Sequence, residues 1–249
     1  MMSVSGETFA SWATHVTRCS NPTFNRVVDR LWSNPSLQKS VLAVLSGITK
    51  TIQDQNGKES GSEYYAVLLS LLNTESNTKT AEAYLLQLVV SKAVPARLLR
   101  SKCAEATKTI TNVLSAALKE DIIDTILCKS LLVSLGRILA AQPTDEWSSE
   151  SLRHTYRIFF QFIEHENATL RRTAQKMIAH LLIFTVSAED DFHPLCHRTI
   201  LHVCKNIRQQ YSELSGLIRT TDTGCGRLLY NLSLLKSIIC LIPEKDVKT

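Results

Sequence analysis

The stretch NATLRRTAQKMIAHLL, residues 167–182, carries the clearest helical signal in the chain. Its apolar positions recur at steps of three and four residues, which places them along one side of an α-helix. These positions are Leu170, Ala174, Met177, Ile178, Leu181 and Leu182. Because an apolar stripe on a helix needs a neighbouring element to cover it, this stretch predicts a packed helix over residues 167–184.

The same spacing recurs on both sides of this stretch. It is found at Leu127, Leu131, Leu135, Ile138 and Leu139, and again at Leu228, Leu232, Leu235 and Ile239. Short polar or proline-bearing breaks interrupt the pattern every ~15 to 20 residues. The spacing and the breaks predict ten helices, over about residues 22–33, 35–54, 60–73, 79–93, 95–118, 121–141, 148–163, 167–184, 191–212 and 225–241.

The composition indicates an all-α fold. Of the 249 residues, 44% are hydrophobic and 20% are charged, as in a chain that can build a core. Eight glycines and six prolines are too few for the tight turns of an all-β sandwich. Ten helices make about five pairs at the ~40 to 47 residue period of HEAT or armadillo units. We therefore expect an α-solenoid of about five such helix pairs, and a compact helical bundle is the alternative.

Residues 167–182 also resemble the second helix of a HEAT repeat. In such a helix a polar residue and an arginine precede a small alanine that allows close packing, as Asn167, Arg171 and Ala174 do here. Ten such helices in succession favour the solenoid over the bundle.

The seven cysteines indicate reduced, buried thiols and a reducing compartment. Their number is odd and no two of them have the C-x-x-C spacing. No signal peptide opens the chain, and the longest apolar runs are too short to span a bilayer, so no membrane partner is expected. The N-x-[ST] matches at Asn167 and Asn231 lie in helical patterns, and we interpret them as chance.

Catalytic motifs are incomplete in the sequence. His165-Glu166 begins like H-E-x-x-H, but Thr169 occupies the position of the second zinc ligand. Ser134 lacks the first glycine of G-x-S-x-G, because Leu132 stands there, and it is better interpreted as a helix residue. We therefore expect no enzyme and no small-molecule substrate.

One short segment holds several potential metal ligands. They are His193, Cys196, His197, His202 and Cys204. On a helix that Pro194 opens, Cys196 and Cys204 would lie about 12 Å apart, too far for one tetrahedral zinc. We expect buried cysteines, with histidines on the helix margin, and no metal. The pair of glycines around Cys225 lacks the further residues of a phosphate-binding loop, so no cofactor is expected either.

The charge distribution points to the later part of the chain. The net charge is +5, and residues 1–90 hold as many acidic as basic side chains. Four basic groups follow: Arg97, Arg100 and Lys102; Arg153 and Arg157; Arg171, Arg172 and Lys176; and Arg198, Lys205 and Arg208. On a concave surface such groups would contact an RNA backbone, and on an outer face they would only keep the chain solvated. We select Arg171, Arg172 and Lys176, with Arg153 and Arg157, as candidate anion- or RNA-binding residues.

Several segments resemble the N-terminal region of the ribosomal RNA-processing protein 12 (RRP12-like) family of HEAT-repeat factors. The likeness covers essentially the whole chain and is densest over residues 5–95. It rests on the segments 19–24, running into Trp32, 43–45, 57–59, 63–66, 83–89 and 171–175.

The resemblance implies a scaffold of ribosome assembly. Family members are nuclear and nucleolar, shuttle to the cytoplasm, and associate with the pre-40S particle and its pre-rRNA. They support rRNA maturation and nuclear export with assembly or transport factors, and are described as binding RNA and the small GTPase Ran. They are much longer, so we expect a partly ordered N-terminal extension over residues 1–20, then a repeat array over 21–249 that corresponds to their N-terminal part.

A general peptide- or protein-binding adaptor, unrelated to ribosomes, is the second hypothesis. Arginines from several repeats that converge on one surface would favour RNA or an assembly particle. Acidic or apolar residues along the inner face would favour the adaptor.

Overall fold

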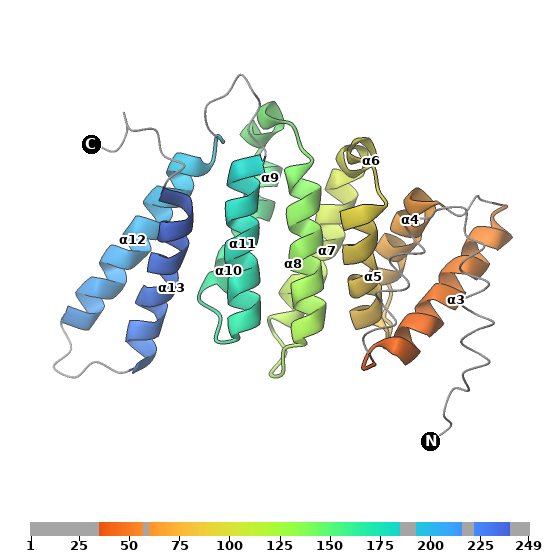
Figure 1. Ribbon diagram of the computed structural model, residues 1–249, viewed down its shortest axis with the longest axis horizontal. Helices are drawn as coiled ribbons and strands as arrows, with labels where there is room; N and C mark the ends of the chain where they lie inside the picture. The colour runs from red at the N-terminus through yellow and green to blue at the C-terminus, as the bar shows by residue number, and fades with distance from the viewer. Residues whose placement is uncertain (1–34, 57–59, 185–192, 216–221, 240–249) are drawn as a thin grey trace. The chain divides into compact units, whose positions relative to one another are not determined.

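The computed structural model describes residues 35–56, 60–184, 193–215 and 222–239, and these residues form helices and no strand (Figure 1). The all-α prediction is therefore confirmed for this part of the chain. The helices are α3 (Gln38–Asp54), α4 (Gly61–Leu72), α5 (Lys79–Lys92), α6 (Ala96–Ser101), α7 (Cys103–Ala117), α8 (Thr125–Ala140), the 3-10 helix η1 (Thr144–Ser148), α9 (Glu150–Arg157), α10 (Phe160–Ile163), α11 (Ala168–Phe184), α12 (Cys196–Ser215) and α13 (Asp222–Ile238).

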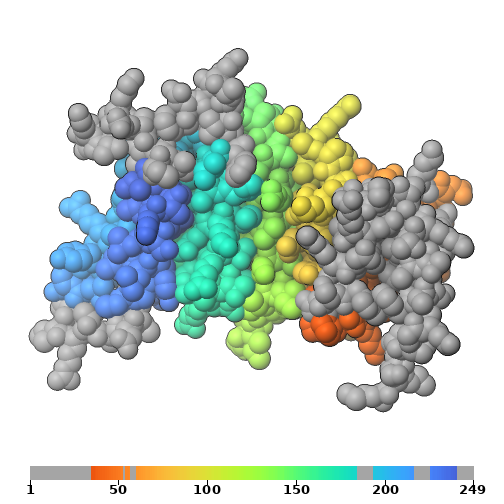
Figure 2. Space-filling view, viewed as in Figure 1, coloured from red at the N-terminus to blue at the C-terminus, as the bar shows by residue number. Residues whose placement is uncertain are grey.

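The chain forms two compact units, which we call unit 1 (Met1–Ser134) and unit 2 (Leu135–Thr249). In unit 1, α4 packs against α3, α5 and α7. In unit 2, α12 packs against α13, and α11 packs against both α10 and α13. In the space-filling view the atoms of α11 and α13 abut on the face shown (Figure 2).

Some predicted helix ends were correct and others were wrong. The helices predicted over 60–73, 79–93 and 167–184 correspond to α4, α5 and α11 almost end to end. The helix predicted from 121 begins only at Thr125, because the Asp124 carboxylate accepts hydrogen bonds from the backbone N–H groups of Ile126, at 2.9 Å, and Leu127, at 3.0 Å. This is the geometry of an N-cap. The helix predicted over 22–33 lies outside the described residues.

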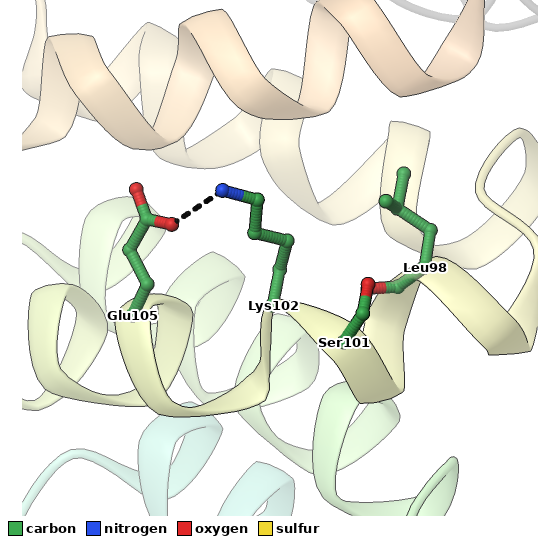
Figure 3. A network of polar contacts seen from close by, with 4 residues as sticks. All are labelled: Leu98, Ser101, Lys102 and Glu105. Atoms are coloured by element: carbon green, nitrogen blue, oxygen red, sulfur yellow. Dashed lines mark hydrogen bonds and ion pairs between the residues drawn. The ribbon is translucent and has the colours of Figure 1, made fainter.

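Two predicted helices are each broken in two. The helix over 95–118 divides at Lys102, whose backbone leaves the helical range. There the Ser101 hydroxyl donates to the Leu98 carbonyl at 3.1 Å, and the Lys102 ammonium pairs with Glu105 at 3.0 Å (Figure 3). The helix over 148–163 divides into α9 and α10 at residues 158–159. At residues 158–159 i→i+3 backbone bonds tighten the chain before α10 starts, whereas the Lys102 N–H still donates to the Leu98 carbonyl, four residues earlier, at 3.1 Å.

The core of unit 1 lies around α4 and α5. Tyr64, Tyr65, Leu68 and Leu69 of α4 are buried. Helix α5 has buried apolar residues on more than one side, because it packs against both α3 and α4. The remaining side of α4 covers α7.

The first turn of α4 gives a test of this packing. A methyl group at Gly61 would lie 2.3 Å from the Ala93 carbonyl oxygen, and backbone has little room to move away. We expect Gly61→Ala to lower the free energy of unfolding by about 2 kcal/mol. Gly47, inside α3, has nothing within 4 Å of the same methyl position, so Gly47→Ala should raise stability by up to ~1 kcal/mol. Urea unfolding of both variants measures the difference, and equal effects would contradict the close contact at Gly61.

The predicted apolar stripes are correct for α8 and largely for α11. All the stripe residues of α8 are buried, and so are those of α11 apart from Met177. The stripe predicted near the C-terminus is wrong, since Leu232 and Ile239 are exposed. The side of α13 that packs inward instead carries Asn231, Leu234 and Ile238.

Asn231 is buried within a small polar network that joins three helices. Its amide donates to Glu164 Oε1 at 2.7 Å and to the Gln210 side-chain oxygen at 3.3 Å. Gln210 donates to the same Glu164 oxygen at 2.8 Å. The network ties α13 and α12 to the end of α10, which explains why a polar residue occupies a core position of α13.

The expectation of buried thiols is confirmed only in part. None of the five described cysteines forms a disulfide; Cys103, Cys128 and Cys196 are buried, whereas Cys204 and Cys225 are exposed, so the prediction is wrong for these two. Burial, with the nearby charges of Asp124 and Glu120, raises the pKa of the Cys128 thiol to about 11. Cys19 and Cys240 lie outside the described residues.

None of the described helices combines the length and the hydrophobicity that a bilayer crossing requires.

Candidate functional site

A groove with a volume of about 340 Å³ opens between α9–α10 and α12 in unit 2. It combines arginines with aromatic rings, and none of the described residues that line it is a carboxylate. Its walls are formed by Arg153, Tyr156, Arg157, Phe160, Leu195, Arg198, Thr199 and His202.

The two sides of the groove run parallel to each other. The Tyr156 hydroxyl bonds to the Thr199 hydroxyl at 3.0 Å, and the rings of Phe160 and His202 lie 4.8 Å apart between centroids. From Tyr156 to Phe160 on one side, and from Thr199 to His202 on the other, the chain runs in the same direction. Side chains one helical turn apart on each side therefore follow the same groove.

The floor of the groove is apolar and firmly packed. Tyr156 and Leu195 are buried there, and the Phe160 ring meets the Tyr156 ring edge-on with centroids 5.6 Å apart. Trp147 supports Tyr156 from the side with centroids 6.0 Å apart. Burial raises the pKa of Tyr156 far above its ordinary value, although the hydrogen bond between Tyr156 and Thr199 acts in the opposite direction. The Tyr156 phenol is therefore protonated at neutral pH.

The rim of the groove is basic. Arg157 and Arg198 are exposed, and neither side chain makes a hydrogen bond or an ion pair within the described ranges. Arg153 is held in place, because its Nε donates to the Ser149 carbonyl at 3.3 Å and its Nη2 to the Ser148 carbonyl. Three guanidinium groups around a low-dielectric floor, with no carboxylate among the described residues that line it, concentrate positive potential in the groove.

His202 adds a second titratable ring to one wall. Partial burial and the nearby charge of Lys205 lower the pKa of His202 below its ordinary value of 6.5, and Glu164 opposes this shift. The ring is therefore neutral at pH 7. It gains a positive charge only under acidic conditions, where the groove would attract anions more strongly.

The groove brings together residues from two of the predicted basic groups. Arg153 and Arg157, selected from their i,i+4 spacing, both line it. Arg198 comes from another group and was not selected. Its helical register with Lys205, seven residues further on, was a signal that both residues lie on one side of α12.

The basic group that was most favoured from the sequence does not form one surface. Arg171 faces the protein, where its Nη1 donates to the His165 carbonyl at 2.7 Å and its guanidinium lies 3.5 Å over the Tyr230 ring. It secures the turn before α11 and the packing of α13. Arg172 and Lys176 are exposed, one turn apart on α11, and remain a separate basic pair.

The basic group before α7 is partly neutralised. Lys102 pairs with Glu105 (Figure 3), and both side chains are about half exposed at the surface. Exposed pairs of this kind contribute little to stability. The pair does reduce the positive charge that this group offers to an anion.

The cluster of histidines and cysteines around α12 is spread over different environments. His193 is buried, with its ring edge-on to Trp147 at a centroid distance of 4.7 Å, so the prediction of marginal histidines is wrong for it. Cys196 is buried and Cys204 is exposed. Within the described residues, no three His, Cys, Asp or Glu side chains are placed to hold a metal ion.

Comparison with known proteins gives a consistent result. A family model described as "RRP12-like, N-terminal HEAT repeats" matches residues 23–249. The chain is 29% identical to the human RRP12-like protein over 236 residues, which cover 93% of this chain and 17% of the human protein. It is 30% identical to the Gallus gallus RRP12-like protein over 234 residues, with the same coverage.

A third relative, aligned over a shorter range, has the same name. The Drosophila melanogaster RRP12-like protein is 29% identical over 178 residues, which cover 71% of this chain and 13% of that protein. The chain thus spans about a sixth of the length of the human and chicken relatives. The HEAT-repeat α-solenoid predicted from the sequence is the fold class of the matched family. The chain belongs to the RRP12-like family and corresponds to its N-terminal HEAT repeats.

Proposed function

We propose that this chain is a non-catalytic helical-repeat scaffold of ribosome assembly. In this role it binds precursors of the small ribosomal subunit in the nucleus and nucleolus, and it supports rRNA maturation and nuclear export. Membership of the RRP12-like family supports the assembly role. Because the chain spans about a sixth of its relatives, the role of the whole protein is transferred to it only as a proposal.

The basic groove of unit 2 is the observation that supports a direct contact with the pre-40S particle. Arg157 and Arg198 are free of protein carboxylates within the described residues, and guanidinium groups suit the oxygens of a phosphodiester. Arg153, fixed by backbone carbonyls, would lose little side-chain entropy on binding. Assembly or transport factors, including Ran, are proposed as further partners of the particle.

The chemistry of the groove supports binding more than catalysis. The Tyr156 phenol is protonated and bonded to Thr199, so it is not a nucleophile at neutral pH. Among the described residues, no hydrogen bond joins His202 to the hydroxyl groups of Tyr156 and Thr199 that line the groove with it, since these two bond to each other and His202 lies beside Asn206. An acid–base pair in mutual reach, which an enzyme would need, does not form among these side chains.

A peptide-binding adaptor is the second candidate function. Its support is the apolar floor of Tyr156, Phe160 and Leu195, which would accept an apolar side chain. The arginine rim would then select acidic residues on either side of that anchor.

Purification of the tagged chain from nuclear extract tests both functions. We expect unprocessed small-subunit rRNA to be enriched over a control HEAT-repeat protein of similar size. Ultraviolet crosslinking before purification separates direct RNA contact from contact through proteins. If rRNA is not enriched, and proteins that stay bound to the chain after nuclease treatment are, the adaptor is supported and the assembly role of these repeats is rejected.

A further inference from the structure

The groove offers hydrogen-bond donors almost exclusively. The guanidinium groups of Arg153, Arg157 and Arg198 cannot accept a hydrogen bond. The Thr199 hydroxyl is engaged with Tyr156, and Nε2 of His202 lies 3.5 Å from the Asn206 amide. In the part of the chain that the structure describes, no carboxylate and no amide side chain is among the lining residues. The ligand must therefore consist mainly of acceptors where it is polar.

This pattern favours a nucleic acid over an extended peptide. Every non-proline residue of a peptide brings a backbone N–H that needs an acceptor when it is buried. The groove would leave such groups unpaired, at a cost of about 1 to 3 kcal/mol each. A phosphodiester brings only acceptors, which Arg157 and Arg198 can satisfy.

The size of the groove favours a single strand. A volume of about 340 Å³ is at the lower end of small-molecule pockets and suits one nucleotide. The bases of a duplex are stacked inside it, so a duplex would meet only the arginines of the rim. An unpaired base can enter.

Two rings form a corner that such a base would fit. The planes of Phe160 and His202 stand at 84° to each other, with centroids 4.8 Å apart, and both line the groove. A flat base that stacks on one ring meets the other edge-on, and both arrangements are favourable between aromatic rings. Proteins that bind single-stranded RNA commonly stack its bases on Phe, Tyr or His rings.

We propose that this groove is a binding site for single-stranded RNA that holds one unpaired base against Phe160 and His202 and the flanking phosphates on Arg157 and Arg198. The inference rests on the proposed function, because it takes RNA as the ligand. Beyond the proposed function, the inference specifies that the RNA is single-stranded and names the residues that select a single strand.

Fluorescence anisotropy with the full chain tests the inference. The probe is a labelled RNA 12-mer without self-complementarity, alone or annealed to its complement. We expect Phe160→Leu to weaken binding of the single strand by about tenfold, with an unchanged dependence on salt, because stacking carries no charge. Binding of the duplex should not change. The matched control is Tyr211→Leu, which removes an exposed aromatic ring of α12 outside the groove.

A second pair of variants covers the case in which Phe160→Leu misfolds. His202→Leu should also weaken binding of the single strand and not binding of the duplex. His197→Leu, at an exposed position of the same helix, should weaken neither. Circular dichroism and thermal unfolding establish that each variant is folded.

The outcomes separate the inference from the proposed function. If both RNA forms bind equally, and the groove variants behave like their controls, the inference is overturned while the proposed RNA contact stands. If neither form binds, both fail. If a peptide with a phenylalanine between acidic residues binds in a manner sensitive to Phe160→Leu while RNA does not, the groove is a peptide site and the inference is overturned.

Discussion

Reversal of two charges on the rim of the groove, Arg157→Glu with Arg198→Glu, is expected to weaken binding of single-stranded RNA by about 100-fold at low salt. Each arginine would lose a charge-assisted hydrogen bond to phosphate, and each glutamate would repel the backbone. The logarithmic dependence of affinity on salt should become shallower by about 0.7 for each phosphate that the protein no longer neutralises. Anisotropy titrations at several salt concentrations measure both quantities.

Two further double variants with the same change in net charge serve as controls. Arg172→Glu with Lys176→Glu alters the exposed basic pair on α11, which is what remains at the surface of the group favoured by the sequence. Lys108→Glu with Lys129→Glu alters exposed lysines of unit 1. We expect only the groove variant to lose about 100-fold. A larger loss in the α11 variant would place the RNA contact there, and equal losses in all three would indicate a general charge effect without a site.

Helical periodicity predicted most of the helices, but it did not predict the buried side of a helix where contacts with other helices determine that side. The stripe of α8 was correct because each of its apolar residues is buried, next to the small side chains of Ser130 and Ser134. In α13 the leucines at 232 and 235 suggested one side, but the buried side is the one that carries Asn231. A polar residue is acceptable there only because Glu164 and Gln210 come from other helices to bond it. No local pattern contains that information.

Only part of the candidate site could be predicted from the sequence, because the rest depends on contacts between helices. Arg153 and Arg157 are neighbours on one helix, so their spacing was enough to pair them. Arg198 joins them only because α12 packs beside α9, through the contact of Tyr156 with Thr199. Arg171 had the same local signal as a surface arginine, yet the Tyr230 ring, far along the chain, covers its guanidinium. Charge can be counted from sequence, but its exposure depends on tertiary contacts.

The buried ring of His193 predicts that unit 2 loses stability in acid. Its Nδ1 accepts a hydrogen bond from the Leu195 N–H at 3.0 Å, which implies that the neutral ring carries its proton on Nε2. Burial lowers the pKa of His193 to about 4. A second proton would have to go to Nδ1, and the bond to Leu195 at the start of α12 would then break.

The sign of the effect follows from the proton binding of the two states. Between pH 6.5 and about 4 the unfolded state binds a proton at His193 that the folded state does not, so stability decreases as the pH falls through this range. The difference in pKa corresponds to a loss of about 3 kcal/mol, complete near pH 4 and absent above pH 6.5. The lowered pKa values of His180 and His202 act in the same direction.

Urea unfolding at pH 7, 5.5 and 4.5, compared between the parent chain and His193→Asn, measures this contribution. The asparagine oxygen can still accept the Leu195 N–H, so the start of α12 is kept while the titrating ring is removed. The variant should be less stable at pH 7, because it no longer packs a ring against Trp147, but its stability should depend less on pH. His197→Asn, at an exposed position, is the matched control. If His193→Asn and the parent chain lose stability in parallel as the pH falls, the acid sensitivity of unit 2 has another source than this ring.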